Sequence, residues 1–495
     1  IQMNPSEKIY NRKNSQVIWK TIISDTVTPV SIMMRLKNHA NTFLLESVEG
    51  GTKRGRHSII GLKPDLWWKS ESDKSFIKHS EVGNFIPTKE TPFESLNKLL
   101  NDSLIDLPKT LPRMSAGIFG YIGYDNVRLI ENISEELFSE NDFPDSLLMR
   151  PSLIIVFDNL KDELSIVSTL RYKEDVDFRQ AKLQSENDID SILQLIREPL
   201  TNTTINSNQN EIKIESNTTK SEYLKMVEKA KNYIYEGDIF QVVLSQKFSS
   251  VFELPAFELY RSLRRINPSP FLFYLNFDHF SVVGSSPEIL IRMLDGEVTV
   301  RPIAGTRPRG INDEEDNNYK TSLLNDPKEL SEHLMLLDLG RNDVGKVSEF
   351  GSVKVTKKFF VELYSHVMHI VSNVVGKLDK KYNIVDVLKA GFPAGTVSGA
   401  PKIRAMQIIE ELEKEKRGIY AGCVGYFSAT GDMDNCITLR TAVIKNGVMH
   451  VQAGAGIVAD SIPENEYEEC RSKAKALFNA AQDALNINNI NNSKI

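Results

Sequence analysis

The sequence predicts an α+β fold, a large two-lobed unit of mostly antiparallel sheets flanked by helices. Strand-like runs follow one another in hairpin-like succession, and helices are few and interspersed, without a regular βαβ alternation. Between Pro199 and Lys220 the chain is rich in Asn, Thr and Ser and poor in apolar residues, as is typical of a linker. We therefore divide the chain near residue 210, into domains of residues 16–205 and 206–485.

Individual elements can be assigned by residue range. In the first domain Ser152–Phe157 has the apolar content of a strand, and residues 117–123 combine apolar residues with glycines. After the linker, Thr219 and Glu222 have the spacing of a capping box and precede apolar residues at helical spacing. Further strands are predicted at 240–248, 271–277, 281–285, 423–428, 437–444 and 451–458, and helices near Pro327, Pro401 and Pro463. The Asn-rich tail 486–495 is expected to fray.

Composition narrows the classes of function. The 495 residues are 41% hydrophobic and 25% charged, as in a soluble globular protein, and the net charge of −6 offers no electrostatic basis for binding nucleic acid. No apolar run approaches the ~18 residues of a membrane span, and residues 1–20 lack the apolar core of a secretory signal. Three cysteines without metal-type spacing fit a reducing cytoplasm. Eight scattered histidines favour carboxylates over histidine as metal ligands.

Two predicted helices each carry a pair of glutamates three residues apart. Residues at this spacing share a helix face, so each pair can direct two carboxylates to one point. If the two faces converge, the like charges favour a hard cation between them, and Mg²⁺ is the expected ion. The alternative is helix capping, because both pairs follow Asp or Ser with a nearby proline. The deeper members are expected to bind the metal and the others to support them: Glu332 and Glu469, with Glu329 and Glu466.

Five segments lie between or beside these glutamate pairs in a characteristic order. They are Ser286–Glu288, Arg301–Gly310, Asp338–Asp343, Phe392–Lys402 and Gly454–Val458. In order and spacing they resemble the chorismate-utilising enzymes, specifically the anthranilate synthase component I family, over residues 30 to 480. The resemblance implies the chorismate-binding enzyme fold, with a regulatory tryptophan-binding first domain and a catalytic second domain.

The resemblance also implies two catalytic residues. Chorismate loses a ring hydroxyl, and because hydroxide is a poor leaving group an acid must protonate it. Glu288 is the candidate acid, provided that burial raises its pKa; an exposed turn residue is the alternative. His369 matches the family histidine that removes a ring proton as pyruvate departs, whereas a lone histidine in an apolar segment is more often a core residue.

Substrate-binding residues follow from the same resemblance. Mg²⁺ would hold the ring carboxylate, and the enolpyruvyl carboxylate needs hydrogen-bond donors. Arg440 offers a planar fork in an apolar strand, although a surface ion pair is the alternative. A glycine turn would offer backbone N–H groups. The full expected set is Gly305, Thr306, Tyr420, Arg440, Gly454, Ala455 and Gly456. Lys473 would either neutralise the site or be solvated.

Ala304 separates related reactions. Relatives that use water, and aminodeoxychorismate synthase, typically have lysine here, acting as a base or nucleophile. A methyl group favours free ammonia as the nucleophile, and therefore formation of anthranilate. An enzyme that stops at the aminated diene is the nearest alternative, which His369 argues against. A non-catalytic tryptophan-binding subunit is another alternative, which the retained acids argue against.

The resemblance implies a partner and an inhibitor. Cys423 lies in a strand-like run without a downstream His-x-Glu, so it is interpreted as structural, and a separate glutamine amidotransferase subunit (component II) is expected in a hetero-oligomer. Leu44–Ser47 and Asn267–Leu272 resemble the two walls of the family's tryptophan site, although Leu44 and Leu45 could be ordinary strand core. The expected inhibitor contacts are Ser47, Pro270, Phe271 and Leu272.

Overall fold

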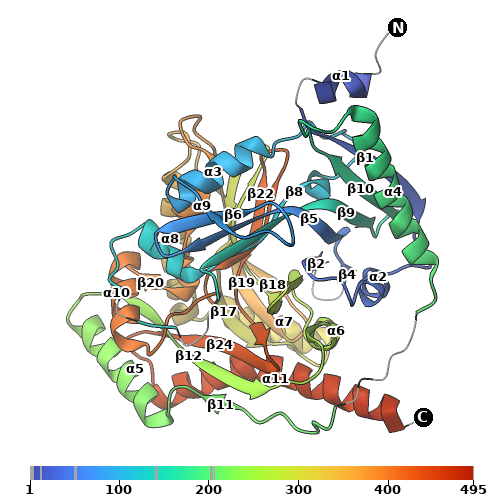
Figure 1. Cartoon of the computed structure of the whole chain (residues 1–495). Coiled ribbons are helices and arrows are strands. Elements are labelled where there is room, and N and C mark those ends of the chain that lie inside the picture. Colours follow the sequence, from blue (N-terminus) through green and yellow to red (C-terminus); the bar gives the residue numbers. More distant parts are fainter. Residues whose placement is uncertain are drawn as a thin grey trace.

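The computed structural model describes residues 5–11, 14–49, 53–135, 137–139, 143–200, 205 and 207–493. Helices of the first half are α1 Pro5–Asn11, α2 Pro29–Arg35, α3 Pro92–Asp102 and α4 Phe178–Arg197, with short 3₁₀ turns at Arg113–Ser115 and Tyr124–Leu129. Its strands are β1 Gln16–Ile23, β2 Thr42–Glu46, β3 Val48–Glu49, β4 Lys53–Arg54, β5 His57–Glu71, β6 Lys74–Lys78, β7 Ile86–Pro87, β8 Gly117–Ile122, β9 Ser146–Asp158 and β10 Glu163–Leu170 (Figure 1).

The second half has more strands and the two helices that carry the glutamate pairs. Its helices are α5 Lys220–Tyr235, α6 Ala256–Ile266, α7 Asp313–Leu324, α8 Pro327–Gly345, α9 Ile384–Gly391, α10 Lys402–Leu412 and α11 Pro463–Ser493, with a 3₁₀ turn at Gly395–Val397. Its strands are β11 Glu215–Ser216, β12 Gln241–Val251, β13 Phe271–Asn276, β14 Ser281–Ser286, β15 Ile289–Leu294, β16 Glu297–Val300, β17 Ile303–Pro308, β18 Lys354–Leu363, β19 Val367–Lys377, β20 Gly399–Ala400, β21 Cys423–Ser428, β22 Met433–Ile437, β23 Thr441–Lys445 and β24 Val448–Ile457.

Two runs of antiparallel strands diverge from the long neighbours β5 and β9. The first run continues through β2, β13, β14, β23 and β24 to β12. The second continues through β8, β21, β22, β15 and β16 to β19, with β17 and β18 beside it. The predicted α+β class with antiparallel sheets is therefore confirmed.

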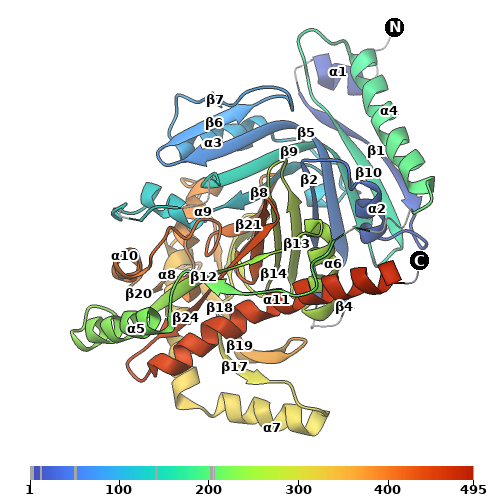
Figure 2. The same cartoon turned by 60° about the horizontal axis from the view of Figure 1, so that its bottom comes forward.

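Apolar side chains place the two runs in layers. One buried cluster contains Phe43 and Phe273 of the first run with Phe119 and Tyr426 of the second, so it fills the space between the runs. The outer face of the first run packs against α6 and α11, and that of the second against α3, α8 and α9. Figure 2 shows the helices lying outside the strands. The result is a helix–sheet–sheet–helix arrangement, with one buried cluster between the sheets and one between each sheet and its helices.

Most predicted elements lie where the sequence placed them. Helix α5 begins after Thr219, whose side chain accepts a hydrogen bond from Glu222 N as predicted for the capping box. Strands β2 and β13 lie on opposite sides of the predicted boundary at 205 and pair with each other, so the two proposed domains share their sheets.

Two predictions about local structure were wrong. The strand predicted at 437–444 is interrupted, because β22 ends at Ile437 and β23 begins at Thr441. The tail expected to fray from residue 486 is instead helical to Ser493, as part of α11. Asn488 Nδ2 donates a hydrogen bond to the Ile205 carbonyl at 3.1 Å, so the asparagines of this tail are used in packing.

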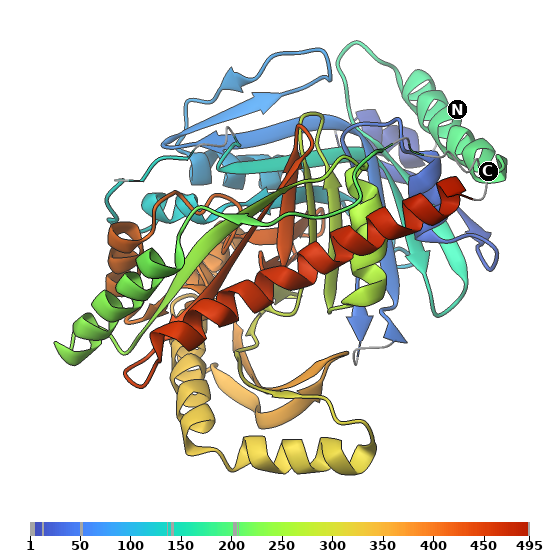
Figure 3. The ribbon, with the colours of Figure 1, turned by 90° about the horizontal axis from the view of Figure 1, so that it is seen from below.

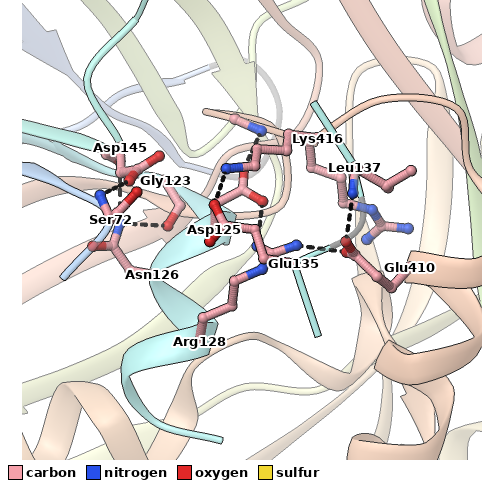
Figure 4. A network of polar contacts seen from close by, with 12 residues as sticks. Ser72, Gly123, Asp125, Asn126, Arg128, Glu135, Leu137, Asp145, Glu410 and Lys416 are labelled. Carbon is pink, nitrogen blue, oxygen red and sulfur yellow. Dashed lines mark hydrogen bonds and ion pairs between the residues drawn. The ribbon is translucent and has the colours of Figure 1, made fainter. Parts of the chain in front are cut away.

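A polar network joins the first half of the chain to the turn before β21 (Figure 4). The buried carboxylate of Asp125 accepts hydrogen bonds from Gly418 N at 2.7 Å and from Arg128 Nη1 at 2.6 Å. Arg128 also binds Glu410 on α10, which in turn accepts from Leu137 N at 2.9 Å. Because the network is satisfied on every side, it holds the backbone that leads to Tyr420.

Within the described residues, no helix is long and apolar enough to cross a membrane.

Candidate active site

Two chain crossings between the sheets place Glu288 and Arg440 together. Residues 287–288 connect β14 of the first run to β15 of the second, and residues 438–440 connect β22 back to β23. The crossings are bonded to each other, because Ser286 Oγ donates to the Ile437 carbonyl at 2.6 Å and Ile437 N donates to the Glu288 carbonyl at 3.0 Å. The break in the predicted strand is thus a structural part of the site.

Glu288 is a buried carboxyl group, only 7% exposed. Burial raises its pKa to about 8, an effect only partly offset by the hydroxyl of Thr396 and the N–H of Ile303. A carboxyl group with this pKa is protonated at neutral pH and can act as a general acid. Glu288 is therefore buried rather than an exposed turn residue, and its role as the acid stays a prediction.

His369 lies on β19 with one ring nitrogen occupied. Its Nδ1 is 3.0 Å from the carbonyl oxygen of Gly305, an acceptor that assigns the proton to Nδ1 and leaves Nε2 unprotonated. Thr306 Oγ1 is 3.2 Å from the same nitrogen. Burial lowers the pKa of His369 to about 4, so the imidazole is neutral at pH 7 and can accept a proton.

Glycine at position 305 is required by its backbone and its surroundings. Gly305 has φ of +78°, at an irregularity in the pairing of β17 with β19. A Cβ atom there would lie 3.1 Å from Glu329 Oε2 on α8. The bulge therefore brings the His369 contact and the first acidic helix to the same place.

Arg440 has a strained backbone, and its guanidinium group makes no ion pair or hydrogen bond within the described part of the chain. Its φ is +45°, which is uncommon outside glycine, and its carbonyl accepts from Ser285 N at 3.1 Å. Burial lowers its pKa. A desolvated cation of this kind is suited to a planar carboxylate ligand.

The 454–456 segment is a strand, and the turn predicted from its glycines was wrong. Gly454, Ala455 and Gly456 belong to β24 and pair with Ser245, Leu244 and Val243 of β12. Strand β23 pairs with β24 only up to Val451, so in the described residues the second edge of 454–456 has no strand partner. Ala455 is fully buried in an apolar cluster, so only its backbone is available to a ligand.

Missing side chains in this segment leave room for neighbouring polar groups. A Cβ on Gly454 would lie 2.9 Å from the hydroxyl of Tyr420, and a Cβ on Gly456 would lie 2.5 Å from Gln241 Nε2. Gln241 Nε2 also donates to Glu332 Oε1 at 3.4 Å. The two glycines therefore leave space for the Tyr420 hydroxyl and for the Gln241 side chain, which in turn bonds to Glu332 on α8.

The glutamate pairs lie at the same end of the molecule, on α8 and on the first turns of α11 (Figure 3). The pKa of Glu332 is raised by burial and then by the negative charges of Glu329 and Glu469. The pKa of Glu466 is also raised, chiefly by burial. The α8 cap is formed by Asp326 alone, whose side chain accepts from the N–H groups of Lys328 and Glu329. Capping therefore leaves the Glu329 carboxylate free for other contacts.

Cations hold two of the four carboxylates. Arg307 Nη1 is 3.1 Å from Glu329 Oε1, and Lys473 Nζ is 2.7 Å from Glu469 Oε1. Among the described residues, no three carboxylate, histidine or cysteine groups are gathered closely enough to hold a metal ion. The donor set still fits Mg²⁺, because it is made of hard oxygen ligands and the buried oxygen Gln241 Oε1 beside Glu332 has no partner.

The sequence matches the model of the chorismate binding enzymes over residues 41–479. The chain belongs to the family of chorismate-binding enzymes. It is 49% identical to anthranilate synthase component 1 of Cereibacter sphaeroides over 97% of both chains, and 43% identical to that of Aquifex aeolicus over 98% of both. The crystal structure of anthranilate synthase component I from Streptococcus pneumoniae TIGR4 superposes with a TM-score of 0.77 at 38% identity, over 92% of this chain and 99% of that one.

A cavity of about 580 Å³ in this chorismate-binding enzyme is lined by three of the four residues predicted to contact an inhibitor. Ser47, Pro270 and Phe271 line it; Leu272 does not, because its side chain is buried in the core on the other face of β13. The walls meet because β2 pairs with β13, with Glu46 opposite Leu272. We call this space the effector cavity.

Sequence reasoning missed several polar residues of the effector cavity. Glu46 lines it and is bound by Arg264 at 2.5 Å and by the Tyr260 hydroxyl at 2.6 Å. Arg301, Glu362 and Tyr364 also line it. Glu46 lies within the Leu44–Ser47 segment, and a charged residue in an otherwise apolar strand could have indicated that it faces a ligand site. No comparable pattern marked Glu362 or Tyr364.

Proposed function

We propose that this chorismate-binding enzyme is component 1 of an anthranilate synthase, converting chorismate and ammonia into anthranilate and pyruvate in tryptophan biosynthesis. The proposal rests on two opposite pKa shifts: the pKa of Glu288 is raised and the pKa of His369 is lowered. Glu288 is protonated and His369 is neutral at the same pH, so one site offers an acid and a base together.

The first step needs the acid. Glu288 donates its proton to the departing ring hydroxyl as ammonia forms a bond to the ring, and water leaves. The product is an aminated cyclohexadiene that still bears the enolpyruvyl ether. Ala304 supports ammonia as the nucleophile, since its methyl group cannot activate water.

The second step needs the base. His369 Nε2 takes the ring proton at the carbon that carries the new amino group, the electrons of that bond complete the aromatic ring, and the carbon–oxygen bond to pyruvate breaks. The hydrogen bond from Nδ1 to Gly305 keeps Nε2 available.

Substrate carboxylates are assigned to two groups of donors. Arg440 and the Tyr420 hydroxyl, with the free edge of Gly454–Gly456, bind the enolpyruvyl carboxylate, while Gly305 and Thr306 form the opposite wall. Glu332 and Glu469, supported by Glu329 and Glu466, would hold Mg²⁺ beside the ring carboxylate. When bound, that ion neutralises the carboxylate and stabilises charge that develops in the ring.

Ammonia is supplied by a second subunit. All three cysteines are free and buried, and burial raises the pKa of Cys423 to about 12, so its thiol is not an activated nucleophile for glutamine hydrolysis. The name component 1 carried by the relatives supports a hetero-oligomer with a glutamine amidotransferase. Free cysteines also support a reducing compartment, the cytoplasm.

Tryptophan is proposed to bind in the effector cavity as a feedback inhibitor, contacting Ser47, Pro270 and Phe271. The cavity combines apolar walls with the charges of Glu46, Arg301 and Glu362, which suits an aromatic amino acid.

A product assay tests the proposed function. Purified chain is incubated with chorismate, ammonium and Mg²⁺, and anthranilate fluorescence and pyruvate are followed. Equal amounts of both products are expected, and an aminated diene without pyruvate would instead indicate the reaction that stops one step earlier. Glutamine in place of ammonium should give no product until the partner is added. Robust turnover with glutamine by the chain alone would contradict the need for a partner.

A further inference from the structure

One tight hairpin separates the effector cavity from the proposed base. Strands β18 and β19 are joined by residues 364–366, and they pair so that Glu362 is opposite His369 and Leu363 is opposite Met368. The turn is held by two hydrogen bonds, from Tyr364 N to the Val367 carbonyl at 2.8 Å and from Arg309 Nη1 to the Tyr364 carbonyl at 2.7 Å. Its geometry is therefore well determined.

Tyr364 forms part of the wall of both sites. Its side chain lines the effector cavity together with Glu362 and Leu363. The same ring meets the imidazole of His369 edge-on, with ring centroids 5.2 Å apart and an interplanar angle of 67°. Tyr364 is 6% exposed, so its ring has little room to move without displacing a neighbour.

The phenol is oriented by charges that face the effector cavity. Tyr364 Oη donates to Glu362 Oε2 at 2.8 Å, and Arg301 Nη2 lies 3.1 Å from Glu362 Oε1. All three side chains line the cavity. An amino acid in the cavity brings an ammonium and a carboxylate, which can exchange partners with the Arg301–Glu362 pair. Such an exchange removes or redirects the acceptor of the Tyr364 hydroxyl.

The turn is also attached to the opposite cavity wall. The side-chain nitrogen His366 Nε2 is 2.9 Å from the carbonyl oxygen of Ile266. Ile266 is the last residue of α6 and directly precedes Asn267–Phe271, which contains the lining residues Pro270 and Phe271. A ligand that shifts this wall therefore acts on the hairpin at two points.

We propose that Tyr364 is a positioning residue for His369 and that it couples the effector cavity to the reaction. With the cavity empty, the hydroxyl bonds to Glu362 and the packed ring supports the imidazole edge. With an amino acid bound, the hydroxyl is drawn to a new acceptor, so the ring turns and His369 is displaced; a ring without the hydroxyl stays in place. This inference rests on the proposed function and names the route of its inhibition.

The test compares two Tyr→Phe variants of the full chain. Tyr364→Phe keeps the ring against His369 but loses the bond to Glu362. Tyr233→Phe is the matched control, because its hydroxyl binds Glu411 at 2.7 Å and its side chain is not among those that line the effector cavity. Tryptophan binding is measured by calorimetry without chorismate, and inhibition is measured in the ammonium-dependent reaction.

Uncoupling is expected in Tyr364→Phe only. Its tryptophan dissociation constant should remain within about twofold of the unaltered chain, whereas half-inhibition should need about tenfold more tryptophan, within the usual range of coupling between sites. The control should change neither quantity. The proposal is overturned if Tyr364→Phe retains ordinary sensitivity to tryptophan, or if its sensitivity and its binding weaken equally.

Tyr364→Leu tests the positioning role without tryptophan. Removing the ring should lower kcat about tenfold while the KM for chorismate stays within about twofold, because the base is misplaced and binding is not. Tyr364→Phe should restore kcat, since it restores the ring edge. A Leu variant with unaltered kcat would overturn this role. Failure of the proposed function is distinct, since the unaltered chain would then make no anthranilate.

Discussion

Lys473 Nζ lies 2.7 Å from Glu469 Oε1 and donates a second bond to the Gly454 carbonyl at 3.0 Å. One lysine thus bridges the second acidic helix to the glycine strand of the proposed substrate site. Because Glu469 is about half exposed, this pair contributes little to stability. The contact matters instead for the position of Glu469, since the proposed divalent ion and Lys473 would share its carboxylate.

Magnesium dependence should rest on Glu332. Glu332→Gln removes a ligand charge, so the Mg²⁺ concentration for half-maximal activity should rise at least tenfold, about 1.4 kcal/mol. Because the pKa of Glu332 is raised, protons compete for it at higher pH than for an ordinary carboxyl, and the unaltered chain should need more Mg²⁺ as pH falls. Measuring turnover against Mg²⁺ concentration at several pH values tests the effect of the substitution and the effect of pH. Glu464→Gln, an exposed acid of α11, the helix that carries Glu469, should behave as the unaltered chain. Equal Mg²⁺ requirements in both variants would refute the metal site.

The acid role of Glu288 predicts one effect of pH and one effect of substitution. Activity of the unaltered chain should fall as pH rises through about 8, where Glu288 loses its proton. Glu288→Gln should lower kcat by about 10² to 10⁴. The exposed Glu297→Gln is the control.

Stability should respond to the same carboxyl group. The folded-state pKa of about 8 exceeds the ordinary value near 4.3, so the stability present at low pH is lost as pH rises between these values. Glu288→Gln lacks this loss. Its melting temperature relative to the unaltered chain should therefore increase from pH 5 to pH 8.5; a difference independent of pH would show that Glu288 is not desolvated.

His369→Asn should separate the two chemical steps. Asn keeps a hydrogen-bond donor for Gly305 but supplies no base, so an aminated diene should accumulate and pyruvate release should fall about 10² to 10⁴-fold. Because the pKa of His369 is lowered to about 4, kcat/KM of the unaltered chain should stay level down to about pH 5 instead of falling near 6.5. Chromatography of the products, with the exposed His279→Asn as control, decides the assignment; unimpaired pyruvate release would remove His369 from the mechanism.

A bulky residue at position 47 should relieve inhibition. Ser47 lines the effector cavity and packs so closely on Gly55 that a Cβ there would lie 1.6 Å from Ser47 Oγ. The ring in Ser47→Phe must therefore enter the cavity, and tryptophan binding should weaken at least tenfold while turnover without tryptophan is retained. Calorimetry and inhibition curves measure this, with the exposed Ser80→Phe for comparison. Unchanged inhibition would place the inhibitor elsewhere.

Local patterns were sufficient for most elements. The Thr219 and Glu222 capping box and the apolar runs of β12, β13, β14 and β21 depend on neighbouring residues, which the sequence displays directly. The run 437–444 was misassigned because its apolar content matches a strand throughout. Only the change of sheets at Thr438–Arg440, with φ of +45° at Arg440, separates its two halves.

The candidate site residues also divide into those that the local sequence reveals and those that only the fold reveals. Glu288, His369 and the glutamate pairs were predicted from residue type and motif, because their expected chemistry depends on the side chain itself. Tyr364 and Glu362 carry no local signal, and Arg301 begins the Arg301–Gly310 segment without a role being assigned to it, since all three matter through neighbours that are distant in the chain.

The amino-acid sequence alone determined the family, the antiparallel α+β class and the identity of the candidate acid, base and metal ligands, because these depend on residue types and short spacings. Tertiary structure decided the protonation states and the relation between the two sites. Burial sets the opposite pKa shifts of Glu288 and His369, and the pairing of β18 with β19 places a wall of the effector cavity against the proposed base. Desolvation and long-range pairing arise only when distant segments pack together.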